Sequence, residues 1–242
     1  SMATEIRALI RENYETKLAA KDSQLRALEM QINPHFLYNT LQSINWRAKM
    51  LKDGEISSMT EALGKLLRIT LSSRNKDSNL GQELDLVGYY MTIQQIRYED
   101  ALSFEVNVPE ELRQVYLPKF TLQPLVENCV KHGFRSSVSH FVVRVTIQGT
   151  PEDWTIRITD NGSGFTEESL ERIRKQLEKC EEDLANQNDI VNRKIGSLAI
   201  SNIYIRCRIL YRSGFRFSFG NNTDGPGAFV EIGIRRKEKD AK

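Results

Sequence analysis

The first third of the chain repeats apolar residues at helical spacing. Residues 4–51 contain no glycine and a single proline, Pro34. Before the proline, two seven-residue rows predict a short coiled-coil seam, formed by Leu18, Leu25 and Ile32 in one row and Tyr14 and Leu28 in the other. After the proline, a stripe of different phase is formed by Leu37, Leu41, Ile44, Ala48 and Leu51. The pattern predicts a helix whose apolar face changes direction at Pro34.

His35, which directly follows that proline, is one of only three histidines in the chain. A proline inside a helix costs about 3 kcal/mol, because it removes a backbone donor and clashes with the preceding turn. At about 100° per residue, the downstream stripe places His35 roughly opposite Leu37 and Ile44, and therefore in solvent. If the seam before Pro34 instead continued past the proline, it would bury His35. An exposed, reactive histidine and a histidine packed in a helical core both remain open.

A second amphipathic helix is predicted after the turn signal Lys52-Asp53-Gly54. Its positions are again three and four residues apart: Ile56, Met59, Leu63, Leu66 and Thr70. Two helices joined by a tight turn cannot bury both stripes alone, so we expect an N-terminal helical hairpin that forms a dimeric four-helix bundle. The polar segment 72–79 lacks this period, and we place a dimerisation domain in residues 1–76 and a second domain in residues 77–242.

The second domain contains segments with helical spacing of apolar residues and segments that alternate as strands do. A third helix contains Leu84, Val87, Tyr90 and Met91, and further helices are predicted over residues 120–132, 166–185 and 200–210. Strands are predicted over residues 102–108, 141–148, 154–159, 215–219 and 229–234. Because most of these strands come in hairpin-like pairs, the expected fold class is α+β, a two-layer α/β sandwich rather than a parallel Rossmann sheet.

Composition limits the partners and the compartment. A hydrophobic content of 40% and a charged content of 27% are typical of a soluble globular protein, and a net charge of +2 without a basic block argues against nucleic acid. No apolar run would span a bilayer. The three cysteines and three histidines lack zinc-ligand spacing, so we expect free thiols in the cytoplasm. Helical pattern starts directly after residue 3, and we expect a fragment whose N-terminal portion is missing.

Three polar segments of the second domain carry candidate chemistry. Within residues 122–133, Asn128 and Lys131 are three residues apart and so share a helix face, although a wet helix face explains this equally. The segment Asp160-Asn-Gly-Ser-Gly164 follows a strand, where glycines admit a ligand and a carboxylate can accept from a nucleobase amine. Residues 196–202 form a small-residue turn that opens a helix and can receive phosphate. Each segment alone could be an ordinary helix face or turn.

In this order and spacing, the segments resemble the GHKL-type ATP-binding domain shared by histidine kinases, gyrase, the Hsp90 chaperones and the MutL repair ATPases. QINPHFLYNTLQSI, QELDLVGYYMTIQQIRYED and LQPLVENCVKHG resemble the LytS/YesM-like sensor histidine kinases, over residues 27–234. The resemblance implies the cytoplasmic catalytic region of a membrane-associated, dimeric two-component kinase. With ATP and Mg²⁺ it would phosphorylate itself, and it would then pass the phosphoryl group to an aspartate of a response regulator.

The resemblance also implies roles for single residues. His35 would accept the γ-phosphoryl group, Asn128 would hold Mg²⁺, and Asp160 would read the adenine amino group. Asn39, one turn beyond His35, could orient the imidazole, although a solvent-facing asparagine is an equal interpretation. Residues 165–195 would form a mobile lid. The candidate nucleotide-binding residues are Glu127, Asn128, Lys131, His132, Asp160, Gly162, Gly164, Gly196 and Asn202.

Two positions depart from related proteins. Ala199 stands where the family usually has glycine, and its Cβ could crowd the phosphates. Pro124 stands four residues before Asn128, where related ATPases have a glutamate that activates water. The absence of that glutamate favours phosphoryl transfer to an imidazole. An imidazole needs no strong base to attack, because its ordinary pKa is about 6.5. Two alternatives remain: a degenerate kinase that acts as a nucleotide-binding dimeric scaffold, and a GHKL-type ATPase.

Overall fold

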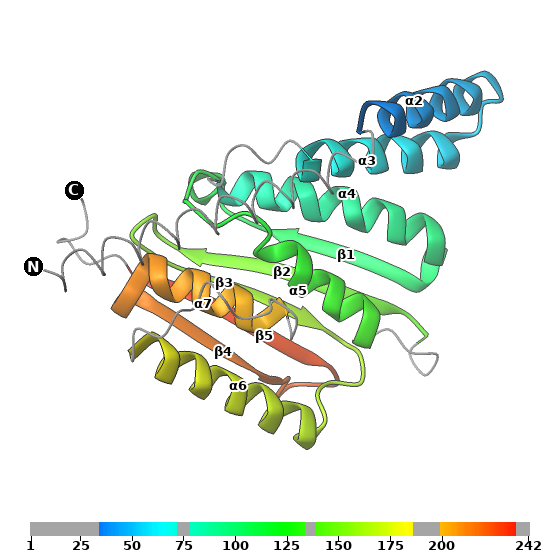
Figure 1. Ribbon diagram of the computed structural model, residues 1–242. Coiled ribbons are helices and arrows are strands. Elements are labelled where there is room, and N and C mark those ends of the chain that lie inside the picture. Colours follow the sequence, from blue (N-terminus) through cyan, green and yellow to red (C-terminus); the bar gives the residue numbers. More distant parts are fainter. Residues whose placement is uncertain (1–33, 72–77, 134–138, 186–198, 236–242) are drawn as a thin grey trace, which may run out of the picture. The chain divides into compact units, whose positions relative to one another are not determined.

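The computed structural model describes residues 34–71, 78–133, 139–185 and 199–235 (Figure 1). The chain divides into two compact units between Leu71 and Ser72. The coiled-coil seam predicted before Pro34 lies outside the described residues, and so does the predicted domain boundary at residues 76 and 77.

The first unit contains the predicted hairpin. Helix α2 (Pro34–Met50) and helix α3 (Gly54–Leu71) are joined at residues 51–53 and pack on each other. The Asp53 carboxylate accepts the Ile56 N–H at 3.0 Å and so caps the start of α3. The Ser57 hydroxyl donates to the Asn45 side chain across the pair at 2.7 Å. The small side chains of Ala48 and Ala62, both buried, let the two helices approach closely.

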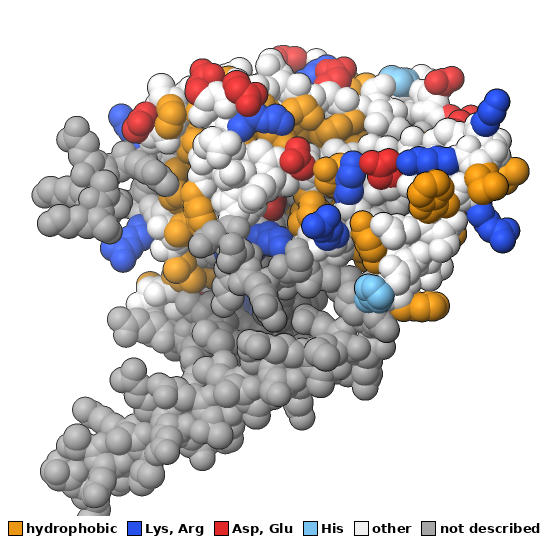
Figure 2. Space-filling view, turned by 90° about the horizontal axis from the view of Figure 1, so that it is seen from above, with side chains coloured by type: hydrophobic (Ala, Val, Ile, Leu, Met, Phe, Trp, Pro, Cys, Tyr) orange, Lys and Arg blue, Asp and Glu red, His pale blue; other side chains and the backbone are white. Residues whose placement is uncertain are grey.

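Packing of α2 on α3 does not cover both apolar stripes. The stripe residues that stay exposed are Ile44 (41%), Leu51 (81%), Ile56 (47%) and Leu63 (37%). Hydrophobic side chains that reach the surface between charged ones are visible in Figure 2. The hairpin therefore retains apolar surface that its own two helices cannot bury.

The second unit is built on a five-stranded mixed sheet of order β1-β2-β3-β5-β4. Strand β1 (Leu102–Asn107) runs parallel to β2 (Phe141–Gly149), and all other neighbours are antiparallel. Strand β3 (Asp153–Asp160) pairs on its other side with β5 (Ala228–Arg235), and β4 (Phe215–Asn221) forms the edge. The α+β class is confirmed, since a parallel Rossmann sheet would lack these antiparallel pairs.

Helices cover one side of this sheet. They are α4 (Leu80–Tyr98), α5 (Leu122–Asn128), α6 (Glu167–Ala185) and α7 (Ala199–Tyr211) (Figure 1). Side chains alternate along β3: Trp154, Ile156 and Ile158 are buried toward the helices, whereas Arg157 and Thr159 lie on the uncovered side. The predicted two-layer sandwich is therefore confirmed, with one apolar and one polar face of the sheet.

Candidate functional site

His35 lies in the first turn of α2 with its side chain exposed. The exposure agrees with the interpretation drawn from the downstream stripe, and His35 is not packed between α2 and α3; the upstream seam that would bury it lies outside the described residues. The Nδ2 atom of Asn39, one turn further, lies 3.3 Å from both Nδ1 and Nε2 of His35. Asn39 can therefore contact either tautomer of the ring.

Asp160, at the end of β3, is buried, with 7% of its surface exposed. Its Oδ1 accepts the Gly162 N–H at 2.9 Å and the Ala228 N–H at 3.4 Å, and the Cys129 thiol also donates to the carboxyl group. Burial raises the pKa of Asp160, while these three donors oppose that rise. The result is a carboxyl group held in one orientation at the end of a strand.

The glycines beside Asp160 permit close packing against the segment that follows α5. A Cβ on Gly162 would lie 2.4 Å from the Gly133 carbonyl oxygen, and a Cβ on Gly133 would lie 2.8 Å from the Phe141 ring. Gly164 has a φ of +71°, which favours glycine. The structure thus brings the Asp160 turn directly against the end of the helix that carries Asn128 and Lys131.

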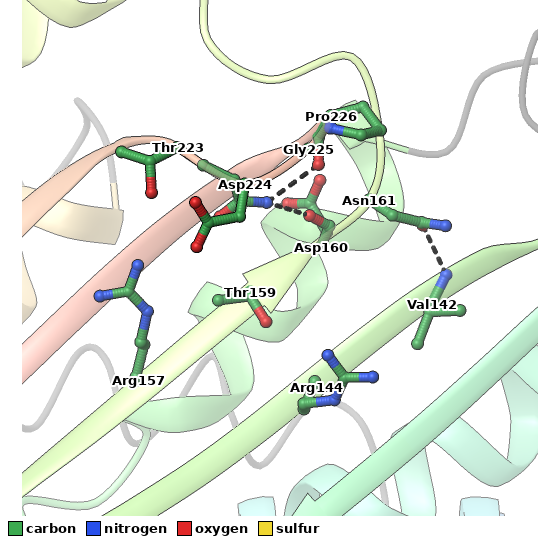
Figure 3. Close-up of a pocket in the computed structure, with 11 residues that line it drawn as sticks. Val142, Arg144, Arg157, Thr159, Asp160, Asn161, Thr223, Asp224, Gly225 and Pro226 are labelled. Carbon is green, nitrogen blue, oxygen red and sulfur yellow. Dashed lines mark hydrogen bonds between the residues drawn. The ribbon is translucent and has the colours of Figure 1, made fainter.

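Asparagines hold the Asp160 turn to its neighbours. Asn161 Oδ1 accepts the Val142 N–H at 2.7 Å, and Asn222 Nδ2 donates to the Asp160 carbonyl oxygen at 2.8 Å (Figure 3). Asn221 Oδ1 accepts the Phe165 N–H at 2.6 Å. No role is predicted for these asparagines from the sequence alone. The only available signal was two adjacent asparagines at the end of a predicted strand, a common feature of turns.

A hollow of about 370 Å³ lies on the uncovered side of the sheet (Figure 3). It is lined partly by Arg144 and Arg157, which pair with Glu105 at 2.6 Å and Glu231 at 3.0 Å. The Asp160 carboxyl group faces the other side, toward Cys129, because side chains alternate along β3. Asp160 is the one predicted nucleotide residue that lines this hollow, so the predicted nucleotide residues do not meet there.

Helix α5 differs from the predicted helix 120–132 at both ends. It begins at Leu122, and residues Cys129–Gly133 form a wider π-helical turn, a feature often found at functional sites. Pro124 lies in the first turn of α5, where a helix needs no donor from it. Lys131 pairs with Glu127 at 2.5 Å but stays 60% exposed, so the pair is weak and can exchange partners.

The remaining candidates are placed less completely. Asn128 is half-buried on α5, and His132 is exposed in the π-helical turn. Asn202 lies in the first turn of α7, which packs against α5. Gly196 and most of the turn before α7 lie outside the described residues. Of the predicted lid, α6 occupies Glu167–Ala185 and buries Leu170, Ile173 and Cys180.

Two family models match the chain. The one described as "Histidine kinase" matches residues 23–102. The one described as "Histidine kinase-, DNA gyrase B-, and HSP90-like ATPase" matches residues 117–227. The first match contains His35, and the second contains all nine candidate nucleotide residues, from Glu127 to Asn202.

Curated relatives agree with these matches. The sensor histidine kinase YesM of Bacillus subtilis is 39% identical over 170 residues, which are 70% of this chain and 30% of that protein. The sensor protein kinase HptS of Staphylococcus aureus is 28% identical over 233 residues, or 96% of this chain and 42% of that protein. The chain thus spans less than half the length of either relative.

Solved structures show a more distant likeness. The histidine kinase domain of a blue-light-activated histidine kinase from Erythrobacter litoralis EL346 is 17% identical, with a TM-score of 0.40, and the match covers 90% of this chain and 94% of that one. Within the described ranges, no helix combines the length and the apolar character of a membrane span.

Proposed function

This chain belongs to the sensor histidine kinases and carries their ATP-binding domain, and we propose that it transfers the γ-phosphoryl group of Mg-ATP to His35. A second transfer would then move the phosphoryl group to an aspartate of a response regulator. The observation that carries the proposal is the exposure of His35, since an imidazole that attacks a nucleotide on another domain must be open to solvent.

The second unit offers groups suited to the nucleotide. The oriented carboxyl group of Asp160 can accept from the adenine amine, and Gly162 and Gly164 let the turn beside it pack closely against Gly133 and Asn221. Asn128 would contribute an amide oxygen to Mg²⁺, which usually binds through one or two protein oxygens and the substrate phosphates. Lys131, with His132 beside it, would exchange its Glu127 partner for a phosphate oxygen.

The proposed transfer is a displacement at phosphorus. A ring nitrogen of His35 forms a bond to the γ-phosphorus while the bond to the bridging oxygen breaks, so ADP leaves and the imidazole loses its proton to solvent. Mg²⁺ would neutralise charge on the phosphates, and Lys131 would add to this effect. Asn39 would hold the ring for the attack. Pro124 provides no carboxylate to activate water, which disfavours hydrolysis.

The proposal extends to assembly and location. The apolar residues left exposed on α2 and α3 support a homodimer in which two hairpins form a four-helix bundle. A receiver domain of a response regulator would dock on the same unit to reach His35. We place the chain on the cytoplasmic side of a membrane sensor, where ATP is available.

Labelling with γ-labelled ATP and Mg²⁺ tests the function. Wild type should acquire acid-labile, alkali-stable label, and His35→Gln should acquire none. His140→Gln is the matched control, because His140 is also exposed but lies directly before β2 in the other unit, and it should label normally. Label retained in His35→Gln would contradict the proposal. Release of phosphate without label would support the ATPase, and neither product would support the scaffold.

A further inference from the structure

The turn Pro118–Thr121, which leads into α5, has a constrained backbone. Phe120 has a φ of +59°, a left-handed conformation that persists in a non-glycine residue only where its surroundings enforce it. Thr121 holds the N-cap position of α5 but makes no side-chain cap, and its hydroxyl donates to the Pro118 carbonyl instead. The support for this turn therefore comes from elsewhere in the chain.

Glu83 of α4 supplies the missing cap. It is 1% exposed, and its Oε1 accepts the Phe120 N–H at 2.7 Å, while its Oε2 accepts the N–H groups of Thr121 at 2.7 Å and Leu122 at 2.9 Å. A carboxylate in this place also complements the positive end of the helix dipole. Burial raises the pKa of Glu83, and the three N–H donors, together with the charge of Arg206, oppose that rise.

Arg206 of α7 holds the opposite side of the same peptide groups. Its guanidinium donates to the carbonyl oxygens of Lys119 at 2.5 Å and Phe120 at 3.0 Å. Among the described residues its buried Nε has no hydrogen-bond partner, an unfavourable arrangement for a donor. The guanidinium is thus placed to suit the turn rather than to satisfy all its own donors.

Both ends of the α5 segment are therefore fixed. The start is held by Glu83 and Arg206, and the far end is held where Gly133 meets Gly162. Asn128 and Lys131 lie between these two anchors. Arg206 also follows Asn202 by four residues, so both side chains lie on one side of α7.

We propose that Glu83 and Arg206 are positioning residues, which clamp the Pro118–Thr121 turn and thereby aim Asn128 and Lys131 at the phosphates of the nucleotide. The inference rests on the proposed function. The adenine end depends instead on Asp160, whose backbone donors Gly162 and Ala228 lie outside the Pro118–Gly133 segment; only its third donor, the Cys129 thiol, lies within it. Loss of the clamp should weaken the phosphate contacts and leave base recognition in place.

The test compares the affinities of Mg-bound, non-hydrolysable ATP and of adenosine for four proteins. These are wild type, Glu83→Gln, Arg206→Met and the control Arg208→Met, measured where thermal melts show every protein folded. Arg208 lies on the same helix and pairs with Glu181 of α6 at 2.7 Å, so its loss removes the guanidinium hydrogen bonds of another arginine of α7, away from α5. Both clamp variants should bind the ATP analogue about tenfold more weakly, with adenosine affinity within about twofold of wild type, and the control should match wild type.

Two further results sharpen the test. The double variant Glu83→Gln/Arg206→Met should bind the ATP analogue no more weakly than whichever single variant binds it less tightly, because both residues act through one turn. Unchanged ATP affinity in the clamp variants, or parallel loss of ATP and adenosine binding, would overturn the inference. If Glu83→Gln fails to fold, Arg206→Met alone decides. Wild type that binds neither ligand would refute the proposed function itself, and the inference with it.

Discussion

The Asp160 carboxyl group combines burial with three donors, and its raised pKa has a consequence for stability. Since the folded state favours its neutral form, its contribution to stability is present below the ordinary carboxyl pKa and is lost as pH rises through the higher folded value. The ionised Asp160 carboxylate therefore lowers the free energy of unfolding at neutral pH. The proposed role of Asp160 as an acceptor for the adenine amine would account for a destabilising charge at this position.

Asp160→Asn should separate stability from binding. The substitution removes the buried charge, so the melting temperature at pH 7 should equal or exceed that of wild type, and the difference should shrink toward about pH 4. ATP binding should fall by at least about tenfold, because the amide that replaces one carboxylate oxygen cannot accept from the adenine amine. Thermal melts across pH and calorimetric titration measure the two effects. Unaltered ATP affinity would argue against the assigned role of Asp160.

At the scale of elements, the contact between the π-helical turn and the Asp160 turn depends on the absence of a side chain at Gly162. Gly162→Ala would place a Cβ 2.4 Å from the Gly133 carbonyl oxygen and 2.7 Å from its Cα, and these are backbone atoms that cannot rotate away as a side chain could. We expect a loss of about 1–3 kcal/mol in the free energy of unfolding, together with weaker ATP binding.

Gly88→Ala is the matched control for this change. A Cβ at Gly88 meets nothing within 4 Å, and Gly88 lies inside α4. Alanine there should stabilise the protein by about 0.5–1 kcal/mol, because the unfolded chain loses conformational freedom. Urea denaturation of both variants measures the two changes in the free energy of unfolding. A Gly162→Ala protein as stable as wild type would show that the two turns are not in the tight contact described.

The α2–α3 hairpin predicts a second result at this scale. If the exposed stripe residues form a dimer interface, Ile44→Glu should bury an unpaired charge and raise the dimer dissociation constant at least about 100-fold. Ser58→Glu, which adds the same charge at an exposed polar position of α3, should leave it unchanged. Sedimentation equilibrium measures both. A monomeric wild-type protein, or equal effects of the two substitutions, would contradict the four-helix bundle.

Across the whole molecule, the sequence was sufficient for features that depend on neighbouring residues. The hairpin and the strand pairs follow from local periodicity, and the end of β3 at Asp160 follows from a glycine-rich break, whereas periodicity left the exposure of His35 open. Features that depend on distant partners were not predictable. Glu83 looks like an ordinary polar position of an amphipathic helix, and its cap is visible only because residues 37 to 39 positions away fold back onto it. The π-helical turn after Asn128 likewise could not be recognised from the spacing of apolar residues along the chain.

The central proposal is that a nucleotide bound at Asp160 in the second unit phosphorylates His35 in the first. The most direct measurement is mass spectrometry, in alkaline conditions, of peptides from wild type, His35→Gln and Asp160→Asn after incubation with Mg-ATP. We predict a phosphoryl group on the imidazole of His35 in wild type, none at any residue of His35→Gln, and a much smaller extent on His35 in Asp160→Asn at ATP concentrations that do not saturate the variant. Phosphorylation at a different residue, or of His35 to the wild-type extent in Asp160→Asn, would contradict the account.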